Sequence, residues 1–423
     1  MKYLIPFLAS LLSALGGLHA AEPSSVPPAE RPAAAATPSA VAEEVNPSVQ
    51  ADGRNVVLRG SLANSRLVFE KTGKGHVAFI GGSITEMNGY RPMVCADLKQ
   101  RFPNTDFTFT AAGMSSTCST TGAFRLKEQV LDQGPVDLFF VEFAVNDDQD
   151  AHHDRRECIR GLEGIIRHVR QYNPAADIVV THFVNESMLG KFKQSEERLS
   201  SRSHNEVLEH YDISGIELNR EVFERIEAGT LTWKQFGGVH PAPVGNRICA
   251  NTIRRLLERA WAEPLAAEAA AKPHAMPAPM DPNNYENGHF VAPAQAEIVR
   301  GWFLGIPAWS QLKGGHRARF DQENLLCATE PGAELRLKFA GRAIGIFLLA
   351  GPDAGMLEAS VDGAPFRRFD LFHAYSAGLH YPRSVIFDAD LAPGAHVLTL
   401  KLPGQKNAAS KGTAARILEF CVN

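Results

Sequence analysis

Four residues of the 423-residue chain have the chemistry needed to break an acyl bond. Ser83 lies in the glycine-rich stretch "VAFIGGSITEM", where a sharp strand-to-helix turn would expose its hydroxyl as a nucleophile. His240 lies in "WKQFGGVHPAPVGNR", and a neutral imidazole is the usual base near neutral pH. Together these two residues predict nucleophilic catalysis by a serine hydroxyl that a histidine base activates.

The other two residues, Gly113 and Asn146, are suited to holding the negative charge that develops on a substrate oxygen. Gly113 ends "FTAAG", and a glycine there lets a backbone N–H approach a substrate closely. Asn146 follows the apolar run "VDLFFVEFAV", and one such amide donor is worth about 3 kcal/mol where it has been dissected. Each residue alone also fits an ordinary turn or helix cap, so the prediction depends on their occurring together.

The elements that must position these residues alternate between apolar runs and amphipathic stretches. We expect buried strands at "HVAFIGG", "FTFTAAG", "VDLFFVEFAV" and "DIVVTHFV". We expect helices at 90–101, 123–131, 155–171, 195–210 and 243–262. This alternation predicts a parallel sheet covered by helices on both faces. Sites in such sheets gather at the carboxyl ends of the strands, where Ser83, Gly113 and Asn146 all fall.

The blocks "GGSIT", "AAGMS", "AVND" and "GGVHP" resemble those of the SGNH hydrolase superfamily, also called GDSL-type esterases. The resemblance implies a three-layer α/β/α domain with a flavodoxin-like parallel sheet. It implies Ser83 as the nucleophile and His240 as the base. The oxyanion hole would comprise the N–H groups of Ser83 and Gly113 and the side chain of Asn146. The implied reaction is acyl transfer through an acyl-serine, usually to water, with no cofactor and no metal.

Three positions depart from the family's pattern: Gly82, Ala144 and Gly237. The third departure matters most, because Gly237 stands where the family usually has the aspartate that orients the histidine. Either a backbone carbonyl holds the imidazole of His240, giving a Ser–His dyad, or another carboxylate replaces the missing one. Asp147 is a possible orienting acid, and Asp148 and Glu142 are also close in sequence to the site.

Two Pro/Ala-rich breaks divide the chain. We expect a signal peptide at 1–20, a linker at 21–50, the hydrolase domain at 51–263, a second linker at 264–284, and an accessory domain at 285–423. The leader "MKYLIPFLASLLSALGGLHA" has one cation, a short apolar stretch and a small residue at its end, which is typical of export signals. Period-2 apolar segments such as "AELRLKFAGRAIGIFLLAGPDAG" predict an antiparallel β-sandwich or jelly roll for the accessory domain.

The net charge and the cysteine content limit the kinds of partner and site that the sequence predicts. The net charge of −4 gives no basic field for nucleic acid or an anionic membrane. After signal cleavage we expect a secreted or periplasmic protein without stable membrane insertion. Export permits disulfides, and Cys327 and Cys421 are a plausible pair because no other cysteine lies in the C-terminal region. No C-x-x-C occurs, so a zinc ribbon is not expected.

Two further segments have side chains that could bind ligands. The loop "NDDQDAHHD", 146–154, holds metal-ligand types, but it lacks the glycine of a tight calcium loop, and its spacing favours a solvated turn before a helix. We therefore predict no metal there. The segment "AYSAGLHYPR", 374–383, mixes aromatic and polar residues and suits either a sugar-binding surface or an ordinary sandwich loop.

An exported esterase joined to a β-sandwich predicts an O-acylated carbohydrate or polysaccharide, with O-acetyl esters as the expected bond. Two alternatives remain open. One is an O-acyltransferase that uses the same Ser83 and His240 with a sugar hydroxyl as the acceptor. The other is a non-catalytic glycan-binding protein in which Gly237 marks a decayed site.

Overall fold

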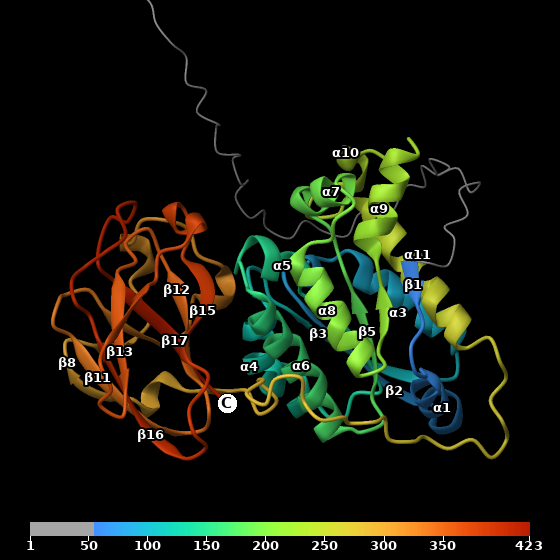
Figure 1. The fold of residues 1–423 in the computed structure, drawn as a ribbon, viewed down its shortest axis with the longest axis horizontal. Coiled ribbons are helices and arrows are strands. Elements are labelled where there is room, and N and C mark those ends of the chain that lie inside the picture. The colour runs from blue at the N-terminus through green and yellow to red at the C-terminus, as the bar shows by residue number, and fades with distance from the viewer. Residues whose placement is uncertain (1–54) are drawn as a thin grey trace, which may run out of the picture. The chain divides into compact units, whose positions relative to one another are not determined.

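The computed structural model describes residues 55–423, which belong to one compact unit of the chain. The predicted signal peptide and first linker lie outside the described residues. From 55 to 260 strands alternate with helices, and from 289 onward the chain forms strands and short 3-10 turns (Figure 1). The α/β region followed by an all-β region is the predicted fold class, which is confirmed.

The first sheet has the strand order β1-β6-β5-β4-β2-β3. The strands are β1 Val56–Val57, β2 Lys74–Gly81, β3 Asp106–Gly113, β4 Leu138–Glu142, β5 Asp177–Thr181 and β6 Ser214–Ile216. Strands β2 to β6 are parallel, and β1 joins the edge antiparallel to β6. The register pairs Gly81 with both Gly113 and Glu142. The carboxyl ends of β2, β3 and β4 therefore meet at one edge of the sheet.

The helices are α1 Ala63–Thr72, α2 Ser83–Glu86, α3 Tyr90–Arg101, α4 Ser119–Gln129, α5 Ala144–Gln149, α6 Arg155–Tyr172, α7 Glu186–Lys193, α8 Leu199–His210, α9 Leu218–Glu227, α10 Trp233–Phe236 and α11 Pro243–Ala260. They cover both faces of the sheet (Figure 1), because alternate residues of a strand point to opposite sides. Ala78 and Ile80 of β2 pack in one apolar cluster with α4, α6 and α8. Val77 and Phe79 pack in another with α1, α3 and α11.

Two predicted helices start elsewhere in the structure. The stretch 123–131 was expected to be a helix, whereas α4 begins earlier, at Ser119, and ends at Gln129. The residues that extend it at its start, 119–122, are Ser, Thr, Thr and Gly, which give no apolar period. The stretch 195–210 was expected to be helical throughout, whereas α8 begins at Leu199. Ser195 has a φ of 56°, which lies in the left-handed region that a right-handed helix excludes. The chain therefore turns here between α7 and α8, and the apolar periodicity does not mark that turn.

The all-β region contains two antiparallel sheets, with orders β15-β12-β17-β10-β9 and β14-β13-β16-β11-β8, and β7 pairs with β17. The strands are β7 His289–Val291, β8 Glu297–Arg300, β9 Phe303–Gly305, β10 Leu325–Ala328, β11 Glu334–Ala340, β12 Ile344–Ala350, β13 Met356–Val361, β14 Arg367–Asp370, β15 Tyr381–Asp388, β16 Ala395–Lys401 and β17 Ala415–Val422. Leu335 and Leu337 of β11 share one buried cluster with Ile346 and Leu348 of β12. The two sheets thus enclose a common core, as in a β-sandwich.

The suggested Cys327–Cys421 disulfide is wrong. All six cysteines are free thiols, and the strand register explains why this pair cannot form. Cys327 of β10 pairs with Arg416 of β17, so Cys421 lies five residues farther along β17. At a strand rise of about 3.4 Å per residue this offset is about 17 Å, whereas bridged Cα atoms lie within about 7 Å.

The segment 264–284 is held along the α/β region by side-chain hydrogen bonds. Arg170 Nη1 donates to the carbonyl of Ala275 at 2.9 Å, and His274 Nε2 lies 2.8 Å from Asp177 Oδ1. Arg160 of α6 contacts Asp281 and also Asp390 of the all-β region. Within residues 55–423, the structure contains no helix with the length and apolar character required to cross a bilayer.

Candidate active site

Ser83 and His240 meet at the carboxyl edge of the sheet. Ser83 is the first residue of α2, directly after β2, and His240 lies in the loop between α10 and α11. The Ser83 Oγ lies 2.7 Å from His240 Nε2, a distance suited to proton transfer. Although the imidazole reaches solvent, surrounding protein atoms reduce its hydration and lower the pKa of His240 from its ordinary value of 6.5. The ring is therefore neutral at pH 7, the form that can accept a proton from Ser83.

Gly113 lies against the turn that carries Ser83. A Cβ at position 113 would lie 2.2 Å from the backbone nitrogen of Glu86 and 2.5 Å from its Cα. No side chain fits there without moving α2, so the close approach requires glycine. The backbone N–H of Gly113 is thereby held beside the turn that carries Ser83.

Asn146 also reaches this turn, from α5 rather than from the end of β4. Its side chain lies against Gly82, where an added Cβ would be 2.2 Å from Asn146 Oδ1. This contact explains one departure from the family pattern, because an aspartate at position 82 would displace the amide. The structure thus brings together Ser83, Gly113, Asn146 and His240.

A second residue of the 146–154 loop fixes the amide of Asn146. Its Nδ2 donates to Asp150 Oδ2 at 2.6 Å, which leaves the other N–H of the amide for a substrate oxygen. The carbonyl of Asp150 accepts a hydrogen bond of 2.9 Å from Nε2 of His373, in the all-β region. Sequence reasoning did not find this connection, because 223 residues separate its two ends.

Glu142, at the end of β4, fixes the turn that carries Ser83. Its Oε1 accepts from the N–H of Gly82 at 2.9 Å, the N–H of Thr85 at 3.2 Å and the hydroxyl of Thr85 at 2.7 Å. The carboxyl is fully buried, and burial raises its pKa to about 7 despite these hydrogen bonds. Glu142 is therefore a structural anchor of the turn rather than a partner of His240.

The carboxylates near the site are committed to other groups. Asp147 accepts from both the N–H and the hydroxyl of Ser119, at 2.8 and 2.7 Å, and its Oδ2 lies 2.9 Å from His204 Nε2. Asp148 contacts Arg198 and accepts from Asn185 and Ser187. Among residues 55–423, no hydrogen bond joins Asp147 to His240, and the imidazole's only one is to Ser83.

The backbone at Gly237 does not admit the family's aspartate. Gly237 has a φ of 108° as the residue that ends α10, in a region that side chains rarely adopt. A Cβ there would lie 2.0 Å from the backbone nitrogen of Ala242. The absence of an aspartate at position 237 therefore goes with a loop conformation that favours glycine. An aspartate there would require the loop to move away from Ala242.

The all-β region also contacts the loops that carry the site. Arg317 Nη2 donates to Ser116 Oγ at 2.7 Å, and Arg319 Nη2 lies 2.9 Å from Glu86 Oε1. Tyr381 donates to the carbonyl of Ser116. Ser116 follows Gly113 closely, so side chains of the second region hold the loop of a predicted oxyanion donor.

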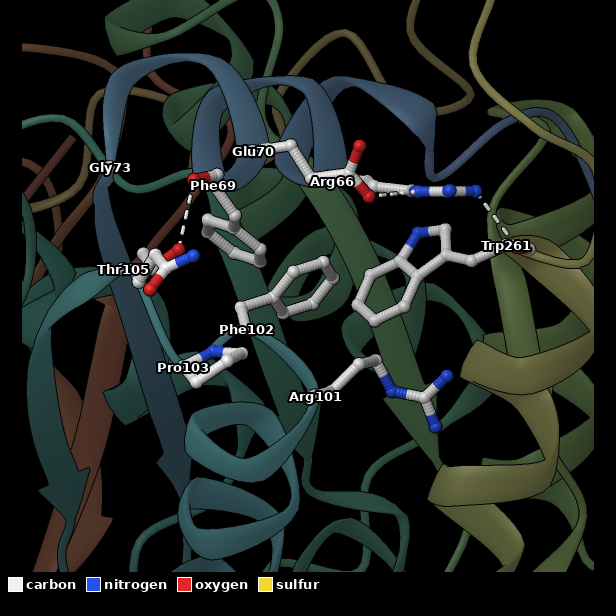
Figure 2. A pocket seen from close by; sticks show the side chains of 10 residues that line it. Arg66, Phe69, Glu70, Gly73, Arg101, Phe102, Pro103, Thr105 and Trp261 are labelled. Atoms are coloured by element: carbon white, nitrogen blue, oxygen red, sulfur yellow. Dashed lines mark hydrogen bonds and ion pairs between the residues drawn. The ribbon is translucent and has the colours of Figure 1, made fainter.

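One cavity lies away from Ser83, and another adjoins the loops of the site. The first, of about 500 Å³, is lined by the rings of Phe69, Phe102 and Trp261 (Figure 2). It also includes Gly73 and Thr105, which precede β2 and β3, so it lies at the edge of the sheet opposite Ser83. A second cavity of about 390 Å³ includes Ser116, Asp150, His373 and Tyr381 among its lining residues. The second cavity therefore adjoins the loops of the site.

Comparison with known proteins agrees with this geometry. Residues 79–248 match the model of the GDSL-like Lipase/Acylhydrolase family, a span that includes all four residues of the site. None of the curated proteins matches the chain.

Among solved structures, a two-domain esterase, CEX, active on acetylated mannans and co-crystallised with mannopentaose, is 20% identical with a TM-score of 0.69. The similarity covers 88% of this chain and 97% of that chain, so the two proteins share the fold of both regions. Axe2, an acetylxylan esterase from Geobacillus stearothermophilus, is 16% identical with a TM-score of 0.34, over 43% of this chain and 94% of that chain.

Proposed function

Because residues 79–248 of this carboxylic ester hydrolase belong to the GDSL-like Lipase/Acylhydrolase family, we propose that it removes O-acetyl groups from an extracellular polysaccharide. The observation that carries the proposal is the 2.7 Å hydrogen bond between Ser83 Oγ and His240 Nε2. The export signal predicted for residues 1–20 supports a site of action outside the cytoplasm.

In the proposed reaction, His240 Nε2 takes the proton of Ser83 as Oγ attacks the acetyl carbonyl carbon. The oxyanion accepts hydrogen bonds from the N–H groups of Ser83 and Gly113 and from Asn146 Nδ2. His240 then gives its proton to the sugar oxygen, which leaves as a hydroxyl, and the acetyl group remains on Ser83. Water attacks this ester with His240 again as the base, and acetate leaves as Ser83 regains its proton.

The base works here as one half of a dyad. Gly237 cannot supply a carboxylate, and the nearby acids bond elsewhere. An orienting acid stabilises the imidazolium that forms in the transition state. Its absence lowers the rate but does not abolish it, because the nucleophile and base contribute more than the orienting member.

A polysaccharide substrate is supported by the aromatic surface next to the site. The rings of His373 and Tyr381 stack with centroids 4.2 Å apart, and Tyr375 lies 5.4 Å from His373. Tyr375 is 52% exposed, which leaves an aromatic face for the apolar side of a sugar ring. The shared fold with an esterase active on acetylated mannans makes acetylated mannan the first substrate to test.

The two alternatives are a non-catalytic glycan-binding protein and an O-acyltransferase. Labelling of the serine tests the first, and product analysis tests the second. A fluorophosphonate should label the wild type and the Ser61→Ala control, in which an exposed serine is replaced, but not Ser83→Ala. Equal labelling of all three proteins, or none of the wild type, contradicts Ser83 as the nucleophile. Acetyl transfer to added mannooligosaccharide, in place of free acetate, would instead assign the acyltransferase reaction.

A further inference from the structure

A cluster of metal-ligating side chains lies outside the catalytic pair. Cys118 precedes α4, Asp147 belongs to α5 and His153 precedes α6, and one ligand atom from each lies within 4.8 Å of the others. Cys118 and Asp147 are buried, and the side chain of His153 is 11% exposed. We propose that these three residues bind one zinc ion.

The placement of His153 favours coordination over a hydrogen bond. Its Nδ1 is buried, lies 3.5 Å from Asp147 Oδ1 and has no hydrogen-bond partner. N–H···O bonds are about 2.7–3.2 Å long, whereas two ligands at about 2.0–2.2 Å from a tetrahedral ion lie about 3.4 Å apart. An unpaired buried nitrogen facing a carboxylate destabilises the empty site, and a bound ion removes that penalty.

The donor atoms select the metal. Thiolate, imidazole and carboxylate together suit zinc, whereas calcium and magnesium prefer oxygen ligands alone. Three protein ligands leave a coordination position for water. Cys118 and His153 both line the cavity of about 390 Å³ described above, which provides an entry path for the ion.

Groups of Ser119 and His204, which are not proposed ligands of the ion, already orient the carboxylate of Asp147. Ser119 donates its N–H to Asp147 Oδ1 and its hydroxyl to Oδ2, and His204 Nε2 lies 2.9 Å from Oδ2. Such partners fix the direction of a metal ligand and raise its affinity. Since Cys118 follows Gly113 and Asp147 follows Asn146, the ion would tie together the two segments that carry the predicted oxyanion donors.

A second group, Asp147, Cys158 and His204, shares the same carboxylate. It is less suited to an ion, because His204 Nε2 is already hydrogen-bonded to Asp147. Cys158 and His204 are also completely buried and do not line the cavity. The loop 146–154 alone had predicted no metal, and the missing donor, Cys118, comes from a different part of the sequence.

The test measures zinc directly in the full chain without the predicted signal peptide, with its purification tag removed and its cysteines kept reduced. We expect one equivalent of zinc after incubation with Zn²⁺ and gel filtration. Cys118→Ser should weaken zinc affinity more than about 100-fold, and Ser119→Ala about 10- to 100-fold, as for loss of an outer partner. Cys95→Ser, which replaces a half-buried thiol of α3, is the control and should bind as the wild type does.

Cobalt provides a readout that does not depend on whether the variants fold. Co²⁺ bound to the wild type should show a thiolate-to-cobalt charge-transfer band and tetrahedral ligand-field bands. The proposal is overturned if the wild type retains no zinc, if bound Co²⁺ lacks the thiolate band, or if folded Cys118→Ser binds zinc equally well. Loss of zinc in Cys158→Ser but not in Cys118→Ser would assign the ion to the other group, and so also overturn it.

Discussion

Arg125 donates a hydrogen bond of 2.5 Å from Nη1 to the carbonyl of Ala112, and the same peptide unit carries the N–H of Gly113. Its Nη2 donates to the carbonyl of Gly81 at 2.8 Å. Burial lowers the pKa of Arg125 to about 9, so the group remains a cation at neutral pH. A donor on a carbonyl polarises the whole peptide, and Arg125 therefore strengthens the N–H of Gly113, the predicted oxyanion donor.

Replacing Arg125 should lower kcat with little change in KM. We expect a loss of about 10-fold for Arg125→Lys, which keeps the charge, and about 100-fold for Arg125→Met, less than or similar to the loss of an oxyanion donor itself. The control is Arg170→Met, because Arg170 is also buried and donates to two carbonyls away from the site. If folded Arg125→Met kept wild-type kcat, Arg125 would have only a structural role.

The all-β region should affect kcat through the amide of Asn146. Asp150→Ala removes the acceptor that orients this amide and should lower kcat about 10-fold. His373→Ala releases the carbonyl of Asp150 and should have a smaller effect in the same direction. Steady-state kinetics check both, with His396→Ala as a control from the same region, where His396 bonds to Asp362 and the carbonyl of Ala392. An effect on KM alone would contradict this positioning role.

The pH dependence of kcat/KM should be that of an imidazole without a carboxylate partner. The pKa of His240 is lowered from 6.5 by reduced hydration, and no carboxylate among the described residues bonds to the ring to raise it. The base must be neutral to act, so kcat/KM should rise with pH through an inflection below pH 6.5 and then level off. An inflection at or above pH 6.5, measured on an acetylated oligosaccharide, would indicate a carboxylate partner.

Stability should fall with rising pH because of Glu142. Its pKa is about 7 in the folded protein against an ordinary 4.5, so the folded state holds a proton that the unfolded chain releases between these values. The free energy of unfolding should therefore decrease from pH 5 to pH 8, by on the order of a few kcal/mol from this group. Glu142→Gln should remove that component. Denaturant midpoints at the two pH values test it, with exposed Glu297→Gln as the control; equal pH dependence in wild type and Glu142→Gln would contradict it.

The order of strands and helices could be predicted from the sequence because the apolar runs are long. From Val77 to Gly81 every residue of β2 is buried, so both faces of the strand are covered and the apolar run is unambiguous. Strand β6 is three residues long, and α1 buries Asn64 and Ser65 beside its apolar residues, so neither gives a clear period.

The candidate site was predictable only in part. Ser83, Gly113, Asn146 and His240 follow strand ends or precede a helix, and local pattern locates such positions. The partners of these residues are set by tertiary contacts that no local pattern records, as with Arg125 and the carbonyl of Ala112 or His373 and Asp150. The same limit applies to Asp147, whose neighbours Ser119 and His204 come from other helices.

We propose that Ser83, activated by His240, cleaves acetyl esters on a polysaccharide. The most direct test measures acetate released from acetylated mannan and acetylated xylan by the wild type and by Ser83→Ala. We predict continuous release by the wild type and a loss of at least about a thousandfold in the variant. Equal release by both proteins, or none from any acetylated polysaccharide by the folded wild type, would contradict this role of Ser83.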